Sequence, residues 1–357
     1  MTSLQQTVAS APTPARTLRV LHVTDVFQGG ISRAVHSMLA NSPDGATHHL
    51  LYEGSEVPDL RYFDSVERLP RSFATRILAV GRHARQIGAD VIYAHSSWAG
   101  VFARALPKHV PVIYQPHCYK FEDPTISPLA RAWTHLAEKT LAPRSTWTVV
   151  LSDHERRLTH RLYGAARTHL LNNVPAIDLN SPIALPEARR AFMIGRICPQ
   201  KDPAFFAQFA RALRSTDRET EFVWIGDGEP EARAKLEAAG VRVTGWLTGE
   251  ALIAELSRPG LYVHTASYEG FPLSLLDALQ SGHVAIARQI EPLRGVPIVQ
   301  RTSPEDLARV AHEVFVPGSP EGEAVLAGSI ALNQSMSDDA QREQLRALYM
   351  KVGLERS

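Results

Sequence analysis

The stretch TLRVLHVTDVFQGGISRAVHSMLANS, residues 17–42, has the pattern of a strand, a glycine turn and a helix. An apolar run rich in β-branched residues (17–27) leads into Gln28-Gly29-Gly30, and apolar residues at helical spacing follow. The same plan returns at residues 190–214, RAFMIGRICPQKDPAFFAQFARALR. A unit that occurs twice predicts two domains of one architecture.

Further apolar runs alternate with helical stretches in both halves of the chain. The expected strands beyond the first are 48–53, 90–96, 110–117, 146–152, 190–196, 221–228, 241–246, 261–267, 283–288 and 297–301. This alternation is typical of parallel sheets with helices on both faces. The predicted fold class is therefore α/β, with two doubly wound, Rossmann-like domains that face each other across a cleft.

The domain limits follow from composition. A proline- and asparagine-rich stretch without a steady period separates the two series of strands, and the last stretch has an acidic start and a basic end, as helices do. The predicted segments are a disordered leader (1–17), an acceptor-side Rossmann-like domain (18–175), a linker (176–188), a nucleotide-sugar-binding Rossmann-like domain (189–335) and a C-terminal helix that packs back toward the first domain (336–357).

Composition and charge exclude several classes of protein. The 357 residues include 38 basic and 37 acidic ones, which argues against a dedicated nucleic-acid binder. Two distant cysteines, Cys118 and Cys198, suit free thiols in a reducing compartment. The N-terminus lacks the apolar core of a signal peptide, and no run reaches the length of about 18 apolar residues that spans a bilayer. We expect a cytoplasmic protein.

Two loops are candidates for anion binding, because each joins a strand to the N-terminus of a helix. One contains Arg196 and Lys201, and the other contains Gly29 and Gly30. Free N–H groups and the helix dipole favour a diphosphate at such positions. The spacing alone fits surface charges and a plain tight turn equally well.

The stretch SYEGFPLSLLDALQSG, residues 267–282, contains two carboxylates on either side of a predicted helix start. Pro272 suits the first helical turn, so Glu269 lies in the preceding loop and Asp277 lies mid-helix. About two helical turns of separation exclude a shared proton and a glycosidase-like acid and base pair. We expect the two acids to contact different parts of one extended ligand.

Two features of the first half of the chain, His117 and a group of basic residues, each fit a functional and a structural role. His117 ends an expected strand at the edge where open sheets bind ligands, and a structural role fits it as well. Residues 71–109 contain six basic residues, some interleaved with apolar ones, which suits either an anionic membrane surface or a solvated helix face.

No metal-binding, GxSxG or Walker A pattern occurs, so neither a metal nor a separate cofactor is expected.

With these motifs in place, the chain resembles the family-4 glycosyltransferases, which are retaining, nucleotide-sugar-dependent enzymes of the GT-B fold. The similarity runs in order through TDVFQGGISRAV, IGRICPQKDP, FVWIGDGE, VTGWL and HTASYEGFPLSLLDALQSGHVAIA. The last segment is similar to the E-x7-E motif of the family. Its second acid is Asp277 here, one methylene shorter than the usual glutamate.

The resemblance implies a role for each matching residue. Arg196, Lys201 and the backbone N–H groups of Gly270, Phe271 and Leu273 would bind the donor diphosphate, with Gly29 and Gly30 on the other side of the cleft. Glu269 and His117 would contact the transferred sugar, Asp277 the ribose, and Trp246 the base. The expected catalytic residues are thus Glu269, His117, Arg196 and Lys201.

The resemblance also implies the reaction. A sugar would move from a UDP- or GDP-linked donor to a glycan, lipid-linked or small-molecule acceptor, with domain closure over the donor and without a protein nucleophile. A nucleotide-sugar epimerase of the same fold, or a non-catalytic nucleotide-sugar-binding protein, remain as alternatives. Peripheral contact with an anionic membrane is a further expectation.

Overall fold

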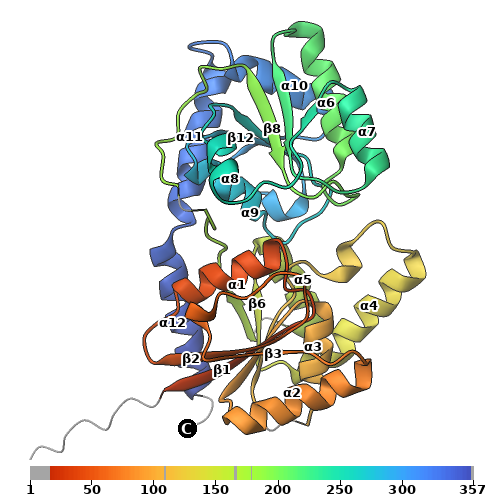
Figure 1. Ribbon diagram of the computed structural model, residues 1–357, viewed down its shortest axis with the longest axis vertical. Coiled ribbons are helices and arrows are strands. Elements are labelled where there is room, and N and C mark those ends of the chain that lie inside the picture. Colours follow the sequence, from red (N-terminus) through yellow and green to blue (C-terminus); the bar gives the residue numbers. More distant parts are fainter. Residues whose placement is uncertain (1–16, 108–109, 165–166, 178, 355–357) are drawn as a thin grey trace, which may run out of the picture.

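The computed structural model describes residues 17–107, 110–164, 167–177 and 179–354. Two parallel sheets lie one beyond the other along the long axis of the molecule, each covered by helices (Figure 1). The predicted fold class is confirmed. The expected leader lies outside the described residues, apart from Thr17.

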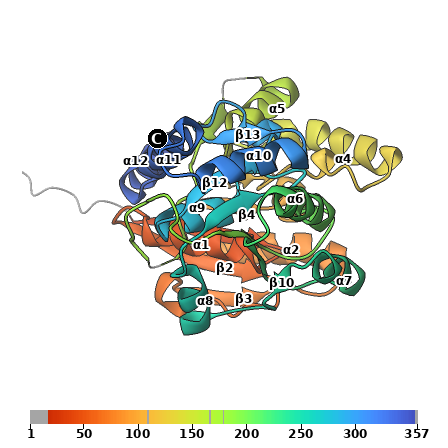
Figure 2. The same cartoon turned by 90° about the horizontal axis from the view of Figure 1, so that it is seen from above.

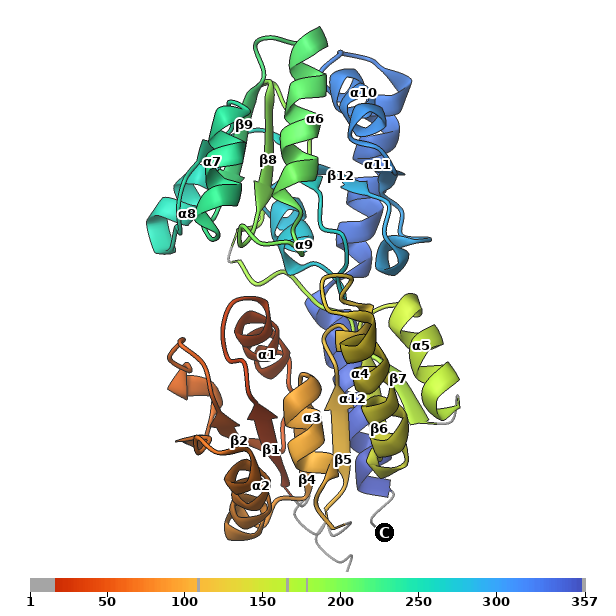
Figure 3. The ribbon, with the colours of Figure 1, turned by 90° about the vertical axis from the view of Figure 1, so that its right-hand side faces the viewer.

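The first sheet is parallel throughout, with the strand order β3-β2-β1-β4-β5-β6-β7. Its strands are β1 (Leu18–Thr24), β2 (Ala46–Tyr52), β3 (Ser65–Arg68), β4 (Val91–His95), β5 (Val112–Gln115), β6 (Trp147–Val150) and β7 (Thr168–Leu170). Its helices are α1 (Gly30–Ala40), α2 (Phe73–Ile87), α3 (Ser97–Arg104), α4 (Pro128–Leu141) and α5 (Asp153–Tyr163). α1 packs on one face of the sheet, whereas α2 and α3 pack on the other (Figure 3).

The second sheet repeats this plan with the order β10-β9-β8-β11-β12-β13, again parallel. Its strands are β8 (Arg190–Ile194), β9 (Glu221–Ile225), β10 (Arg242–Val243), β11 (Leu261–His264), β12 (Val284–Arg288) and β13 (Val299–Arg301). Its helices are α6 (Pro203–Thr216), α7 (Pro230–Ala238), α8 (Gly249–Leu256), α9 (Leu273–Gln280), α10 (Pro304–Val314) and α11 (Pro320–Ser335).

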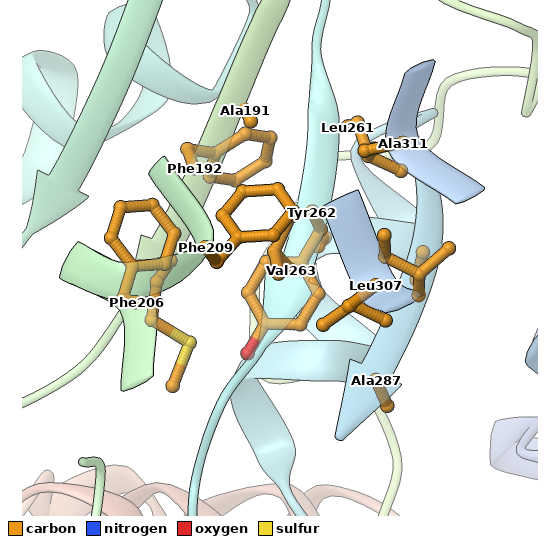
Figure 4. Packing of buried hydrophobic residues seen from close by; sticks show 14 of the residues in the cluster. Ala191, Phe192, Phe206, Phe209, Leu261, Tyr262, Val263, Ala287, Leu307 and Ala311 are labelled. Atoms are coloured by element: carbon orange, nitrogen blue, oxygen red, sulfur yellow. The ribbon is translucent and has the colours of Figure 1, made fainter. Parts of the chain in front are cut away.

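The core of the second domain is rich in aromatic residues. Phe192 of β8 and Tyr262 of β11 meet edge to face with ring centroids 5.6 Å apart, and Phe206 and Phe209 of α6 cover them (Figure 4). Edge-to-face pairs of this kind stabilise the core beyond the area that they bury. This packing holds β8 and β11 side by side, and the loops that follow them form the site.

The last helix, α12 (Asp338–Leu354), leaves the second domain and packs on the first. Leu345, Leu348 and Val352 are fully buried against the face of the sheet that α1 also covers. Gln341 donates a hydrogen bond from Nε2 to the carbonyl of Asn172 at 2.7 Å. Seen from above, α11 and α12 lie together at one end of the molecule, and α4 projects at the other (Figure 2).

The boundaries of some elements differ from the prediction. β1 ends at Thr24 rather than at residue 27, because Asp25 turns into the loop, where its carboxylate accepts the N–H of Ala99 at 3.1 Å. β3 and β7 were not predicted, since strands of four and three residues with few buried side chains show no clear period. Pro272 directly precedes α9 instead of lying in its first turn.

Both domains bury histidines in their cores. His22, His95 and His264 are fully shielded from solvent, and His48 and His283 are nearly so. Burial lowers the pKa of each of these imidazoles below the usual 6.5, and it lowers the pKa of His48 and His283 to about 4. These side chains are therefore neutral in the folded protein near pH 7.

We predict that the free energy of unfolding decreases on acidification from about pH 7 to about pH 5. The unfolded chain takes up protons on these histidines near their unperturbed pKa, whereas the folded protein does so only at lower pH. A histidine whose folded pKa is about 4 contributes about 2 kcal/mol to this loss. Urea titrations at both pH values measure it, and His48→Gln should show a smaller difference between them. An unchanged or greater stability at the lower pH would contradict the prediction.

Candidate active site

The carboxyl-terminal ends of both sheets face a cavity of about 670 Å³ between the domains. Open parallel sheets bind ligands at this edge, beside the strands where the order of the sheet reverses. Every predicted site residue except Asp277 lines the cavity, namely Gly29, Gly30, His117, Arg196, Lys201, Trp246, Glu269, Gly270, Phe271 and Leu273. Its size is that of a site for one nucleotide-sized ligand.

The loop after β8 brings Arg196 and Lys201 to the cavity wall. Gly226 and Gly228, in the loop after β9, let the two loops lie in contact, since a Cβ at either position would meet the backbone of Gly195 or Ile197. Arg196 is exposed and makes no hydrogen bond or ion pair with another described residue. Its guanidinium is therefore available for an anionic ligand.

Lys201 and Glu269 form an ion pair within the cavity wall. Only 17% of the lysine side chain and 11% of the glutamate side chain are exposed. Gln200 also donates from Nε2 to the Glu269 carboxylate, at 3.4 Å, and to the carbonyl of Tyr268, at 3.2 Å. Glu269 thus holds the ammonium group in place, and Arg196 is left as the cation without a protein partner in this loop.

Gly270 lies where the two domains come close together. A Cβ at this position would lie 2.9 Å from the carbonyl oxygen of His117 and 3.1 Å from the backbone nitrogen of Cys118. The amide of Asn173, in the segment that joins the domains, donates to the carbonyl of Phe271 at 2.9 Å. These contacts hold the N-terminus of α9 over the edge of the first sheet.

Asp277 lies outside the cavity, and both of its carboxylate oxygens bind protein groups. Oδ2 pairs with Arg33 of α1, and Oδ1 accepts the N–H of Ala176 at 2.8 Å. Asp277 is 2% exposed. The structure thus uses this acid to join α9, α1 and the linker, and its contact with a ribose stays a prediction. Arg33 was not predicted, although it lies one turn from Gly30 at the start of a helix.

The N-terminus of α1 is covered by a carboxylate of the first domain. Gly29 has a φ of 58°, and its N–H donates to Glu56 Oε1 at 2.6 Å. The hydroxyl of Ser32 donates to the other oxygen of Glu56. Gly30 faces the second domain, where a Cβ would lie 4.0 Å from Leu273. Glu56 also lines the cavity, and no motif in its loop signalled this position.

His117 follows β5 with a φ of 55°, a left-handed conformation that is uncommon outside glycine. Its Nε2 lies 3.1 Å from Nδ1 of His95, so Nδ1 is the ring nitrogen left to the cavity. Burial lowers the pKa of this imidazole to about 4. His117 is therefore neutral near pH 7 and can donate or accept one hydrogen bond there.

Trp246 lines the cavity between β10 and α8, with 63% of the residue exposed. Thr248 and Leu252 line the wall beside it. An exposed indole next to a cavity offers a flat surface for an aromatic ring.

Across the described residues, no group of three or more histidine, cysteine or acidic side chains is placed to hold a metal ion.

Two family models match the chain, one for each domain. Residues 13–173 match "Glycosyl transferase 4-like domain", and residues 188–315 match "Glycosyl transferases group 1". Together the two matches cover most of the chain.

Relatives and a solved structure resemble the chain over much of its length. The α-D-kanosaminyltransferase of Streptomyces kanamyceticus is 25% identical over 76% of this chain and 80% of its own. The UDP-Gal:α-D-GlcNAc-diphosphoundecaprenol α-1,3-galactosyltransferase of Escherichia coli is 26% identical over 56% of this chain and 58% of its own. The structure of Anabaena HepE with UDP and glucose superposes with a TM-score of 0.74 at 14% identity, over 94% of this chain and 100% of that one.

Three observations indicate the same family. They are the order of strands in both sheets, the cavity between the carboxyl-terminal edges of the sheets, and the two matching family models. The chain belongs to the group 1 glycosyltransferases and has their two-domain GT-B fold.

Proposed function

We propose that the enzyme transfers a sugar from a UDP- or GDP-linked donor, with retention of its anomeric configuration, to a glycan, lipid-linked or small-molecule acceptor. One observation carries the proposal. The free guanidinium of Arg196, the Lys201–Glu269 pair and the N-terminus of α9 converge on one cavity between the two sheet edges. This is the arrangement that a diphosphate next to a sugar requires.

The relatives support the class of substrate. The Escherichia coli enzyme is named for a UDP-linked donor and a diphosphoundecaprenol acceptor, and the HepE structure contains UDP and glucose. The Streptomyces relative is named as a transferase of an amino sugar. We infer that the donor for this chain is a nucleoside-diphosphate sugar. The proposed acceptor is a glycan, a lipid-linked compound or a small molecule.

Arg196 and Lys201 would stabilise the leaving diphosphate. As the bond between the sugar and the phosphate oxygen breaks, its electron pair goes to the diphosphate, and negative charge grows beside the two cations. The N–H groups of Gly270, Phe271 and Leu273 would add donors at the same place. Preorganised donors and charges of this kind are commonly the largest contribution to catalysis.

The other residues would position the rest of the donor. Glu269 and His117 would contact hydroxyls of the transferred sugar, and Trp246 would stack on the base. Gly29 and Gly30 leave room for the diphosphate on the first domain, once Glu56 no longer covers the helix start. For Asp277 to bind the ribose, its pair with Arg33 would have to open.

Replacement of Arg196 or Lys201 tests the diphosphate site. We expect Arg196→Ala and Lys201→Ala each to lower kcat by at least about 100-fold, since each removes a charged donor from the leaving group. Nucleotide release from a panel of UDP- and GDP-linked sugars, with acceptors present, is the measurement. Arg211→Ala, an exposed change on α6 away from the cavity, is the matched control.

The outcomes separate the alternatives. Wild-type rates in both variants would refute the assignment of the site. Conversion of the donor sugar without nucleotide release would identify an epimerase. Tight binding of UDP or GDP without turnover across a broad acceptor panel would identify a binding protein.

Retention of configuration follows from attack on the face that the diphosphate leaves. The acceptor oxygen forms the new bond to the anomeric carbon, and its proton passes to the leaving phosphate oxygen. Glu269, the acid beside the sugar, is already paired with Lys201. We expect the first product formed to have the anomeric configuration of the donor, measured by proton NMR coupling constants. The opposite configuration in that product would contradict the proposed reaction.

The outer face of α2 is the proposed contact with an anionic membrane. Arg82 and Arg85 of α2 are exposed, as are the apolar side chains of Phe73 and Leu78, and Arg71 is exposed just before the helix. Two other basic residues of this region point elsewhere: Arg76 pairs with Glu53, and Arg104 is buried beside Glu138 at 3.0 Å. Lys108 and His109 lie outside the described residues. No helix in the described part of the chain is long and apolar enough to cross a bilayer.

We expect the protein to co-sediment with anionic vesicles more than with neutral ones, and less as salt is raised, because surface charges are screened. The double variant Arg82→Glu with Arg85→Glu should lose this preference. Arg309→Glu, an exposed change on α10 of the other domain, should keep it. Equal sedimentation with both kinds of vesicle would count against membrane contact.

A further inference from the structure

Arg33 brings a positive charge to the cavity from the first domain. It lies on α1, one turn after Gly29, and its backbone N–H donates to the carbonyl of Gly29 at 3.3 Å. The residue lines the cavity, and 35% of its side chain is exposed. Arg196 and Lys201 line the same cavity from the second domain. Cations of both domains therefore reach one ligand-sized space.

The protein uses only one edge of the Arg33 guanidinium. Nη2 pairs with Oδ2 of Asp277 on α9. Among the described residues, no other group accepts a hydrogen bond from this guanidinium, and none of its nitrogen atoms is buried without a partner. Its Nε and Nη1 groups are therefore open to solvent. The N–H groups of arginine form a planar fork that matches phosphate oxygens, so a ligand can bind the free edge while Asp277 keeps the other.

Asp277 holds Arg33 from behind. The carboxylate is buried on α9, and its other oxygen, Oδ1, accepts the N–H of Ala176 at 2.8 Å. If the carboxylate turned into the cavity, it would leave both the guanidinium and this N–H, and breaking a buried ion pair is strongly unfavourable. Arg33 lines the cavity, whereas Asp277 does not. The pair thus presents its arginine to a ligand.

The start of α1 offers little else to an anion. The N–H of Gly29 donates to Glu56 Oε1 at 2.6 Å, and the hydroxyl of Ser32 donates to the other oxygen of Glu56. A negative charge therefore already covers the helix start. Among the described first-domain residues that line the cavity, Arg33 is the only arginine or lysine. An anion held between the domains meets the positive charge of the first domain at Arg33.

We propose that Arg33 donates hydrogen bonds to the diphosphate of the donor from the first domain, and that Asp277 is a positioning residue that holds Arg33 in place. The inference rests on the proposed function, because it takes a nucleoside-diphosphate sugar as the ligand. The diphosphate then lies between cations of both domains, with Arg196 and Lys201 on the other side. Its charge is shared by the two domains, so the bound donor helps to hold them together.

Replacement of Arg33 in the full-length protein tests the assignment. Isothermal titration measures the affinity for UDP or GDP, whichever the wild-type protein binds more tightly, and for the matching nucleoside, which lacks the diphosphate. We expect Arg33→Met to weaken nucleotide binding by about tenfold to 100-fold, because charge-assisted hydrogen bonds to the phosphates are lost. The affinity for the nucleoside should stay the same.

Replacement of Asp277 tests its role as a positioning residue. Asp277→Asn keeps the shape of the side chain and removes its charge, so it should weaken nucleotide binding less than Arg33→Met does. Added to Arg33→Met, it should cause no further loss, because Asp277 acts through Arg33. The double variant removes both charges of the pair, and it replaces Arg33→Met in the test if that variant does not fold.

Arg19→Met is the matched control. It also breaks an ion pair of the first domain between a partly exposed arginine and a buried aspartate, Asp90. Arg19 lies near the start of β1, at the edge of the sheet away from the cavity. Both affinities of this variant should equal those of the wild-type protein.

The outcomes distinguish the two possible uses of Asp277. If Asp277 itself bound the ribose, Arg33→Met would free its carboxylate, and an unchanged or higher nucleotide affinity would overturn the proposal. Equal losses for nucleotide and nucleoside, or a further loss when Asp277→Asn is added, would overturn it as well. Nucleotide binding that depends on Arg33 in a protein that transfers no sugar would support the role of Arg33 and refute the proposed transfer alone. A wild-type protein that binds neither UDP nor GDP would refute both.

Discussion

The absence of a side chain at Gly270 lets the loop before α9 lie against the first domain. A Cβ there would lie 2.9 Å from the carbonyl oxygen of His117, so any other residue would push the loop before α9 away from the first sheet. Glu269 and Phe271 would move with that loop, and Glu269 holds Lys201. The spacing between Lys201 on one side of the cavity and His117 on the other therefore depends on this close approach of the two backbones, as well as on the Arg33–Asp277 ion pair.

The charged groups around the cavity differ in whether they have a partner in the protein. Lys201 is matched by Glu269, and the start of α1 is covered by Glu56, whereas Arg196 has no partner among the described residues. An anion that enters the cavity therefore meets one free cation, Arg196, and two cations that are already paired, Lys201 and Arg33. It also meets a helix N-terminus, that of α9, which favours negative charge. This arrangement suits a ligand that carries negative charge.

Asp277 joins the two domains through its short side chain. Its carboxylate reaches Arg33 of α1 and the N–H of Ala176, and so it ties the second domain to the first and to the linker. The carboxylate is buried, and both of its oxygens have partners, as a buried charge requires. The shorter acid in the E-x7-E pattern thus coincides with a structural joint between the domains.

The sequence by itself determined the fold class, the loops of the site and most of the residues in them. Strand, loop and helix follow from local periodicity, and a doubly wound sheet brings the loops after its strands to one edge. This is why Arg196, Lys201, Glu269 and Gly270 could be predicted to meet. Only the tertiary structure decided three sets of contacts. These are the partners of Asp277, the hydrogen bonds from the start of α1 to Glu56, and the histidine side chains in contact from His117 to His48. Those contacts depend on which strands and domains become neighbours, and residues far apart in the chain show no shared period from which that can be read.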